Sequence, residues 1–153
     1  MPQFATKRRV RHAASEMFDL VADMERYPEF VPLCRALRVL RRVPEPEGVE
    51  VVVAQVTVAY KLIVQNFISR VTFDRANLQI QVEYLEGPFR RMENRWVFHA
   101  VGDHVCDVEF FIAYEFKSRT LAALMGAMFD AAFRRFSAAF ERRADEIYGR
   151  RPA

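Results

Sequence analysis

The C-terminal segment from Leu121 to Tyr148 restricts the fold of this chain more than any other feature. It contains no proline and one glycine, Gly126, and its apolar residues recur at the three- and four-residue intervals of a helix face. Ser118 precedes the segment as a candidate N-cap. A helix of this length spans about 45 Å, so its apolar face needs a whole sheet to cover it. That face comprises Leu121, Leu124, Met125, Met128, Phe129, Ala132, Phe133, Phe136, Ala139, Phe140 and Ile147, and we expect Leu124, Met128, Phe129 and Phe136 to face the sheet.

The middle of the chain has the period of strands. Apolar and polar residues alternate in 67–73, 80–84, 92–98 and 106–116, while 49–62 is almost entirely β-branched or small, as is typical of strands. A shorter strand is expected around Leu37 and Val39. Turn residues such as Gly87-Pro88 and Gly102-Asp103 separate the segments. Because the connections are short, neighbouring strands must be antiparallel.

The first 30 residues supply the remaining elements. Residues 6–10 predict a first strand, 13–24 show helical spacing, and 25–30 predict a very short second helix closed by Pro28 and Pro32. Together these elements predict an α+β helix-grip fold, in which a curved antiparallel sheet wraps around the long C-terminal helix, with two short helices after the first strand. No linker or repeat divides the chain, so we expect a single domain over residues 1–153.

Composition and charge exclude several classes of protein. Hydrophobic residues make up 52% of the chain, but no run reaches the ~18–20 apolar residues of a membrane-spanning helix. No secretory signal is visible. Cys34 and Cys106 have no CxxC spacing, which indicates neither a disulfide framework nor a zinc site. The net charge of +3 comes from interleaved charges, a mild bias towards anionic surfaces rather than an arm that binds DNA. We therefore expect a cytoplasmic protein.

No group of residues in the sequence forms a recognisable catalytic or metal site. His12 lies at a strand end, and His99 and His104 flank a turn. Phosphate-binding glycine loops and nucleophile elbows are absent from the sequence. The acidic row of Asp107, Glu109 and Glu115 is expected on a solvated sheet face, in cross-strand pairs with Arg91 and Arg95.

The apolar face of the sheet leaves two interpretations open. Its rings fit a packed core, but a curved sheet facing a straight helix also leaves space that aromatic and methionine side chains can line. Asn94 lies on this face between Met92 and Trp96, and its amide needs a partner in the backbone, in water or in a ligand. The candidate ligand-binding residues are Asn94, Trp96, Phe98, Phe110, Tyr114, Met125, Phe129, Phe133 and Phe136.

Short motifs along the chain resemble one protein family. They are Tyr27–Cys34 (YPEFVPLC), Glu86–Phe89 (EGPF), Asn94–Trp96 (NRW), Val108–Phe110 (VEF), Tyr114–Ser118 (YEFKS) and Ala138–Ala144 (AAFERRA). In this order they are similar to the coenzyme Q-binding protein family of the START-like, polyketide cyclase-related superfamily, which also includes ribosome-association toxins. The resemblance extends from Arg9 to Tyr148.

The resemblance implies a helix-grip domain that binds ubiquinone or a related polyprenyl lipid, as a chaperone or carrier supporting respiratory electron transport and quinone biosynthesis. The family's other branch gives a second hypothesis, a protein that binds the large ribosomal subunit and blocks subunit joining. Ubiquinone is expected as a bound ligand and not as a catalytic cofactor.

The same resemblance bears on catalysis and on the membrane. Some members of the superfamily are aromatic cyclases, but the inward positions of this chain hold no acid or base, so no enzymatic activity is expected. A lipid carrier must also visit a membrane, here at the periphery of the inner membrane. Two groups of cations are candidates for transient contact with its anionic surface, Lys7, Arg8, Arg9 and Arg11, or Arg90 and Arg91. The alternative is that these residues are only solvated surface charges.

Overall fold

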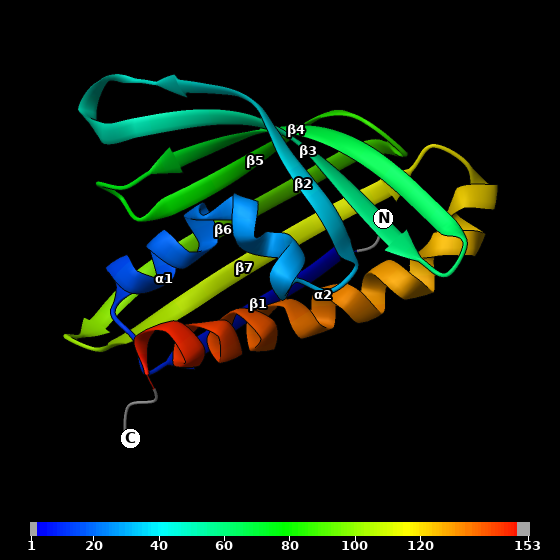
Figure 1. The fold of residues 1–153 in the computed structure, drawn as a ribbon. Coiled ribbons are helices and arrows are strands. Elements are labelled where there is room, and N and C mark those ends of the chain that lie inside the picture. The colour runs from blue at the N-terminus through cyan, green and yellow to red at the C-terminus, as the bar shows by residue number, and fades with distance from the viewer. Residues whose placement is uncertain (1–2, 150–153) are drawn as a thin grey trace.

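A seven-stranded antiparallel sheet curves around one long helix in the computed structural model, which describes residues 3–149 (Figure 1). The expected domain of residues 1–153 thus includes six residues, 1–2 and 150–153, outside the described part. The strands are β1 (Gln3–Val10), β2 (Cys34–Pro44), β3 (Val49–Tyr60), β4 (Ile63–Asp74), β5 (Gln79–Glu86), β6 (Phe89–Gly102) and β7 (Val105–Phe116). The helices are α1 (Ala14–Ala22), the 3₁₀ helices η1 (Met24–Glu29) and η2 (Pro46–Gly48), and α2 (Arg119–Tyr148).

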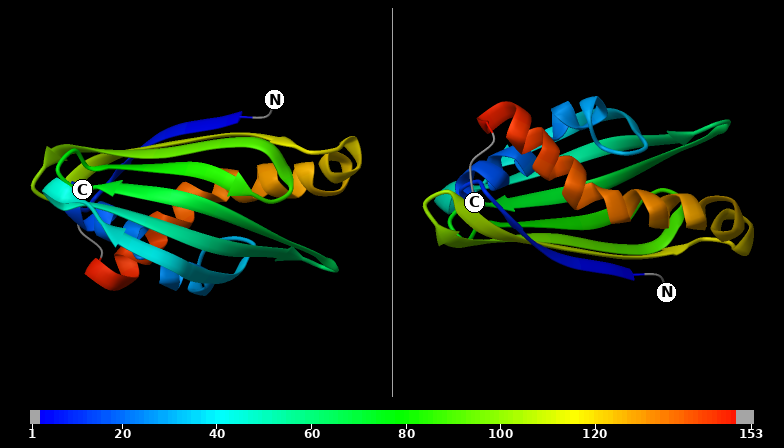
Figure 2. Two further views of the ribbon diagram at one scale, coloured as in Figure 1. Left: turned by 90° about the horizontal axis from the view of Figure 1, so that it is seen from above. Right: turned by 90° about the horizontal axis from the view of Figure 1, so that it is seen from below.

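The order of strands in the sheet is β1-β7-β6-β5-β4-β3-β2. Strands β2 to β7 follow each other as a meander, and β1 pairs with β7 from Gln3 opposite Ala113 to Val10 opposite Cys106. Two edges therefore remain, β1 and β2. Figure 2 shows that α2 runs obliquely across the strands on the concave side of the sheet, where α1 also lies. This arrangement confirms the predicted α+β helix-grip fold.

The hairpin between β3 and β4 differs from the prediction of a strand that ends at Leu62. Tyr60 pairs with Ile63, so Lys61 and Leu62 form a two-residue turn. Lys61 has a φ of 55°, a conformation in which glycine or asparagine is usual. The sequence lacks that turn signature, and this is why the turn was missed. The side chain of Leu62 is 99% exposed.

The second short helix also differs in detail. Pro28 lies inside η1 and does not end it. Two hydrogen bonds flank Pro28, from the Arg26 amide to the Asp23 carbonyl and from the Phe30 amide to the Tyr27 carbonyl. Neither bond needs an N–H from the proline.

Helix α2 is unbroken, as predicted, and the Ser118 hydroxyl accepts a hydrogen bond from the amide of Leu121 at 3.1 Å. Phe129 is buried against the sheet, while Met128 and Phe136 are partly buried. The prediction that Leu124 faces the sheet is wrong, because its side chain is 59% exposed. At ~100° per residue, Leu124 lies about 140° around the helix from Phe129.

The C-terminal half of α2 is held by polar contacts with the beginning of the chain. His12, which is fully buried, lies with its Nε2 2.7 Å from Asp145 Oδ1. The Tyr148 hydroxyl donates to the carbonyl of Glu16 at 3.2 Å, and Arg8 pairs with a carboxylate of this helix. Ile147, which the sequence places on the apolar face, is exposed because Tyr148 takes the inward position in this last turn.

Candidate ligand-binding cavity

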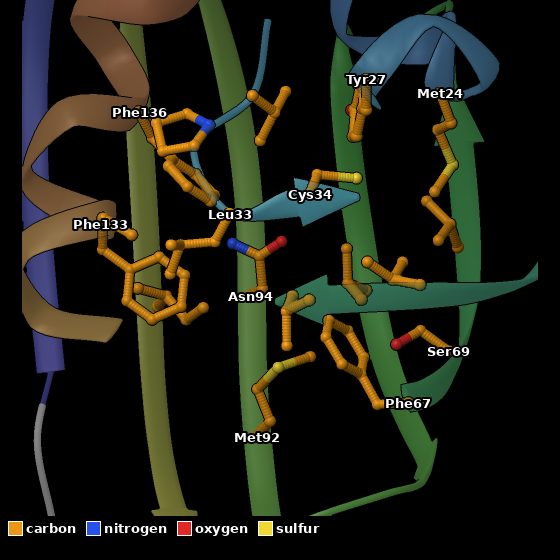
Figure 3. Close-up of a pocket in the computed structure, with 18 of the residues that line it drawn as sticks. Met24, Tyr27, Leu33, Cys34, Phe67, Ser69, Met92, Asn94, Phe133 and Phe136 are labelled. Carbon is orange, nitrogen blue, oxygen red and sulfur yellow. The ribbon is translucent and has the colours of Figure 1, made fainter. Parts of the chain in front are cut away.

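A cavity of about 120 Å³ lies between the concave face of the sheet and α2. Three parts of the chain form its wall, and Figure 3 shows how their side chains point into it. The sheet contributes Ala54, Val56, Val58, Phe67, Ser69, Val71, Ile80, Val82, Phe89, Met92, Asn94, Trp96, Phe110 and Ile112. Helix α2 contributes Phe129, Ala132, Phe133, Phe136 and Phe140, and the segment 24–34 contributes Met24, Tyr27, Val31, Pro32, Leu33 and Cys34.

The described residues of this wall include no aspartate, glutamate, lysine, arginine or histidine. Tyr27 and Cys34 carry its only ionisable side chains. The Tyr27 hydroxyl donates to the backbone carbonyl of Val21, and burial raises its pKa. Burial also raises the pKa of the Cys34 thiol to about 11. Both groups are therefore neutral near pH 7, and the wall carries no charge.

Asn94 and Ser69 place polar atoms on the sheet side of the cavity (Figure 3). Asn94 Nδ2 donates to the carbonyl of Phe111 at 2.8 Å, which gives this amide the backbone partner that its position requires. The hydroxyl of Ser69 is buried and has no hydrogen-bond partner among the described residues. Sequence reasoning missed Ser69, although it shares the inward set of its strand with Phe67 and Val71.

The predicted site residues divide into two groups. Six of the nine line the cavity: Asn94, Trp96, Phe110, Phe129, Phe133 and Phe136. Phe98, Tyr114 and Met125 are buried outside its wall. Phe98 is covered by α1, where its ring lies 5.9 Å from that of Phe18, and Tyr114 packs against Phe133 at 5.4 Å. Contact between these residues and a ligand stays a prediction.

Sequence reasoning also missed the contribution of segment 24–34. It supplies six wall residues but has neither the helical nor the strand period, so no periodic pattern could assign an inward face. The sequence did mark this segment in another way, because the family-like motif Tyr27–Cys34 coincides with this part of the wall.

A cluster of aromatic rings surrounds Phe89, which lines the cavity together with Phe67 and Phe129. The ring of Phe89 lies 5.1 to 5.8 Å, between centroids, from five others, those of Phe67, Tyr84, Tyr114, Phe116 and Phe129. Two residues earlier, Gly87 has a φ of 148°, and a Cβ there would lie 2.5 Å from Cβ of Phe67. The EGPF motif therefore lets the chain pass over β4 and bury a phenylalanine.

The cross-strand pairs predicted for the outer face form in part, because Arg91 pairs with the acidic row and Arg95 does not. Arg91 contacts Glu115 at 2.8 Å, while Arg95 pairs with Glu93 on its own strand at 3.1 Å. His99 lies 2.9 Å from Glu109. Within residues 3–149, no group of three or more His, Cys, Asp or Glu side chains is placed to hold a metal ion.

Residues 10–141 match the family described as polyketide cyclase / dehydrase and lipid transport. The chain belongs to this family. The description covers both catalysis and lipid binding, so membership does not decide between them. No helix in the described range is long and apolar enough to cross a membrane.

Among curated relatives of this family member, the ribosome association toxin RatA of Pseudomonas aeruginosa is 32% identical over 139 residues. These cover 90% of the chain and 92% of the toxin. The mitochondrial coenzyme Q-binding protein COQ10 homolog B of Xenopus laevis is 30% identical over 88% of the chain, but the match spans only 54% of that protein.

Solved structures share the fold of this chain. An 18 kDa protein of Caulobacter crescentus is 33% identical with a TM-score of 0.78, and the match covers 97% of this chain and 99% of that one. The aromatase/cyclase Zhui of a Streptomyces species is 18% identical with a TM-score of 0.74 over 94% and 93% of the two chains. At that identity the likeness to Zhui concerns the fold alone.

Proposed function

We propose that the chain binds an uncharged, lipid-like molecule in the cavity between the sheet and α2. The observation that carries the proposal is the wall itself, which is apolar, without charge and not filled by side chains. Moving apolar surface out of water into such a site yields about 25 cal/mol per Å². An apolar cavity of about 150 Å³ stays dry and takes up benzene, so this one has a similar capacity.

Ubiquinone or a related polyprenyl lipid is the more specific hypothesis for the ligand. The similarity to the coenzyme Q-binding homolog supports it. The volume of about 120 Å³ admits roughly one ring, so a whole polyprenyl chain requires the helix and the sheet to move apart. The cavity itself therefore has room for the ring of such a lipid and not for its whole chain.

Organic extraction of the purified protein, followed by mass spectrometry, tests this function. We expect a neutral lipid in near-stoichiometric amount. Protein stripped of lipid should gain thermal stability when a short-chain ubiquinone is added, because a ligand that binds only the folded state stabilises it. An extract without lipid, together with no stabilisation by ubiquinone or by a polyprenyl alcohol, would contradict the proposal.

For the cellular role, a second candidate has better support than ubiquinone delivery. It is association with the large ribosomal subunit and a block of subunit joining. The relative named ribosome association toxin matches this chain over nearly its full length, whereas the coenzyme Q-binding relative matches over about half of its own. Strand β2 also offers exposed arginines, Arg35, Arg38, Arg41 and Arg42, at the edge of the sheet, and arginine is suited to contacts with RNA phosphates.

Sedimentation with purified ribosomal subunits tests the second candidate. We expect the protein to travel with the large subunit at low salt and to be released as salt rises, because phosphate contacts depend on ionic strength. Reversing Arg35 and Arg38 to glutamate should abolish the association. Reversing Arg70 and Arg134, which lie elsewhere on the surface and pair with Glu83 and Asp130, serves as the control. Protein that stays unbound at every salt concentration would exclude this role.

We also propose binding in place of catalysis. Acid–base chemistry needs a titratable group within reach of the substrate, and the described wall offers only the neutral Tyr27 and Cys34. Contact with an anionic membrane remains a proposal too. Arg8, Arg9 and Arg91 have carboxylate partners at 2.7 to 2.8 Å, and these pairs reduce the charge available for such a contact.

A further inference from the structure

The hydroxyl of Ser69 has no function within the fold. Its side chain lines the cavity from β4, is 3% exposed, and makes no hydrogen bond to the residues that the structure describes. Buried polar groups are normally paired, because a hydroxyl moved out of water without a partner is costly. Apolar Phe67 and Val71 flank Ser69 on the same face of the strand. An alanine here would pack equally well and avoid the cost.

We propose that Ser69 donates a hydrogen bond to an oxygen of the ligand, and that the site thereby selects uncharged lipids that carry a carbonyl or ether oxygen. This inference rests on the proposed binding function and narrows its ligand class. Figure 3 shows the Ser69 hydroxyl among the side chains that point into the cavity. The hydroxyl is thus available to a bound molecule and to no described part of the protein.

The position of Ser69 relative to Asn94 sets a length for the ligand. Asn94 on β6 pairs with Val82 on β5, which pairs with Val71 on β4, two residues from Ser69. Two strand spacings across the sheet and two residues along a strand separate the α-carbons by about 12 Å. A ligand that reaches both polar side chains therefore carries oxygens at two places, and a ligand with one oxygen uses one of them.

The absence of charge in the wall determines what the site rejects. An ionised carboxylate or phosphate that entered the cavity would find no lysine, arginine or histidine among the described wall residues. It would lose its hydration without gaining a counter-ion, and that loss is far larger than the gain from one hydroxyl. Fatty acids and phospholipid head groups should therefore be excluded, even where a neutral lipid with the same apolar chain binds.

Three probes built on one ring, the size that the cavity admits, separate these effects: cyclohexane, cyclohexanone and cyclohexanecarboxylate. Trp96 is the only tryptophan of the chain and lines the cavity, so its fluorescence reports binding directly. We expect the ketone to bind about 3- to 10-fold more tightly than the alkane, the gain from one hydrogen bond. The carboxylate should bind at least ~100-fold more weakly than the ketone.

Ser69→Ala should remove the preference for the ketone and leave the affinity for cyclohexane unchanged. Ser137→Ala is a matched control, because the Ser137 hydroxyl on α2 is also buried and without a partner among the described residues but lies outside the cavity wall. Circular dichroism would establish that both variants fold. The control variant should keep the full preference.

The outcomes separate this inference from the function on which it rests. Binding of cyclohexane with no preference for the ketone, or a preference that survives Ser69→Ala, would overturn the role of Ser69 and leave the apolar cavity in place. Cyclohexanecarboxylate that binds as tightly as the ketone would overturn the selection against charge. Failure of all three probes to bind would contradict the proposed function and this inference with it.

Discussion

Replacing Phe89 with alanine is expected to lower the free energy of unfolding by about 3–5 kcal/mol. The side chain is 1% exposed and packs against five other rings. These neighbours come from β4, β5, β7 and α2, so they cannot all collapse into the space that a missing phenyl group leaves. The melting temperature should fall by roughly 6–20 °C for a chain of this size.

Phe111→Ala is the control for this measurement. The Phe111 ring is only partly buried and lies under the Arg95 guanidinium at 4.2 Å, so its loss should cost about 1 kcal/mol or less. Urea denaturation of both variants gives the two free energies. A Phe89→Ala variant as stable as the Phe111→Ala variant would show that the ring cluster around Phe89 does not stabilise the fold.

Filling the cavity should abolish lipid binding without unfolding the protein. Ala132 lies on α2 in the wall of the cavity, and Ala132→Phe would direct a phenyl group into it. Because a 150 Å³ cavity is occupied by one benzene ring, the added ring would take up most of the roughly 120 Å³. We expect the lipid that co-purifies to fall at least ~10-fold, with a change in stability of at most about 1–3 kcal/mol from local overpacking.

The neighbouring substitution Ala131→Phe provides the control, because Ala131 is exposed on the same helix. It should leave the amount of bound lipid unchanged. Undiminished lipid in folded Ala132→Phe would mean that the ligand binds elsewhere. The same variant separates the two candidate functions, since association with ribosomes through the arginines of β2 should not depend on the cavity.

The fold could be predicted from the sequence because the helical period of the C-terminal segment and the two-residue period of the strands are both strong. Phe129 and Phe136 are separated by two helical turns, and the alternation in 92–98 identifies the inward face of β6. Periodicity assigns a face, however, and not a position along the strand. Trp96 and Phe98 share one face, yet only Trp96 reaches the cavity, because α1 covers the next inward position. The prediction that Leu124 faces the sheet was wrong for a related reason, because a broad apolar stripe does not show where the contact with the sheet ends.

Contacts between distant parts of the chain could not be predicted from the sequence. His12 and Asp145 are 133 positions apart, and neither stands in a pattern that indicates a pair. The unpartnered state of Ser69 is a property of its surroundings in the cavity. The sequence nevertheless shows Ser69 as a polar residue within an apolar alternation. This is the observation that identified Asn94 as a candidate, and it applies equally to Ser69.

The two outer strands have a consequence for self-association. An open sheet exposes unpaired N–H and C=O groups along each edge, where another copy can add a strand and begin aggregation. Here β1 carries Lys7, Arg8 and Arg9, β2 carries Arg35, Arg38, Arg41 and Arg42, and neither strand contains an acidic residue. Three of these seven cations, Arg8, Arg9 and Arg42, pair with carboxylates of neighbouring elements, so the net positive charge of the edges comes mainly from Lys7, Arg35, Arg38 and Arg41. Two molecules that approach edge to edge therefore repel each other. This repulsion opposes strand pairing between their sheets and so protects the protein against aggregation.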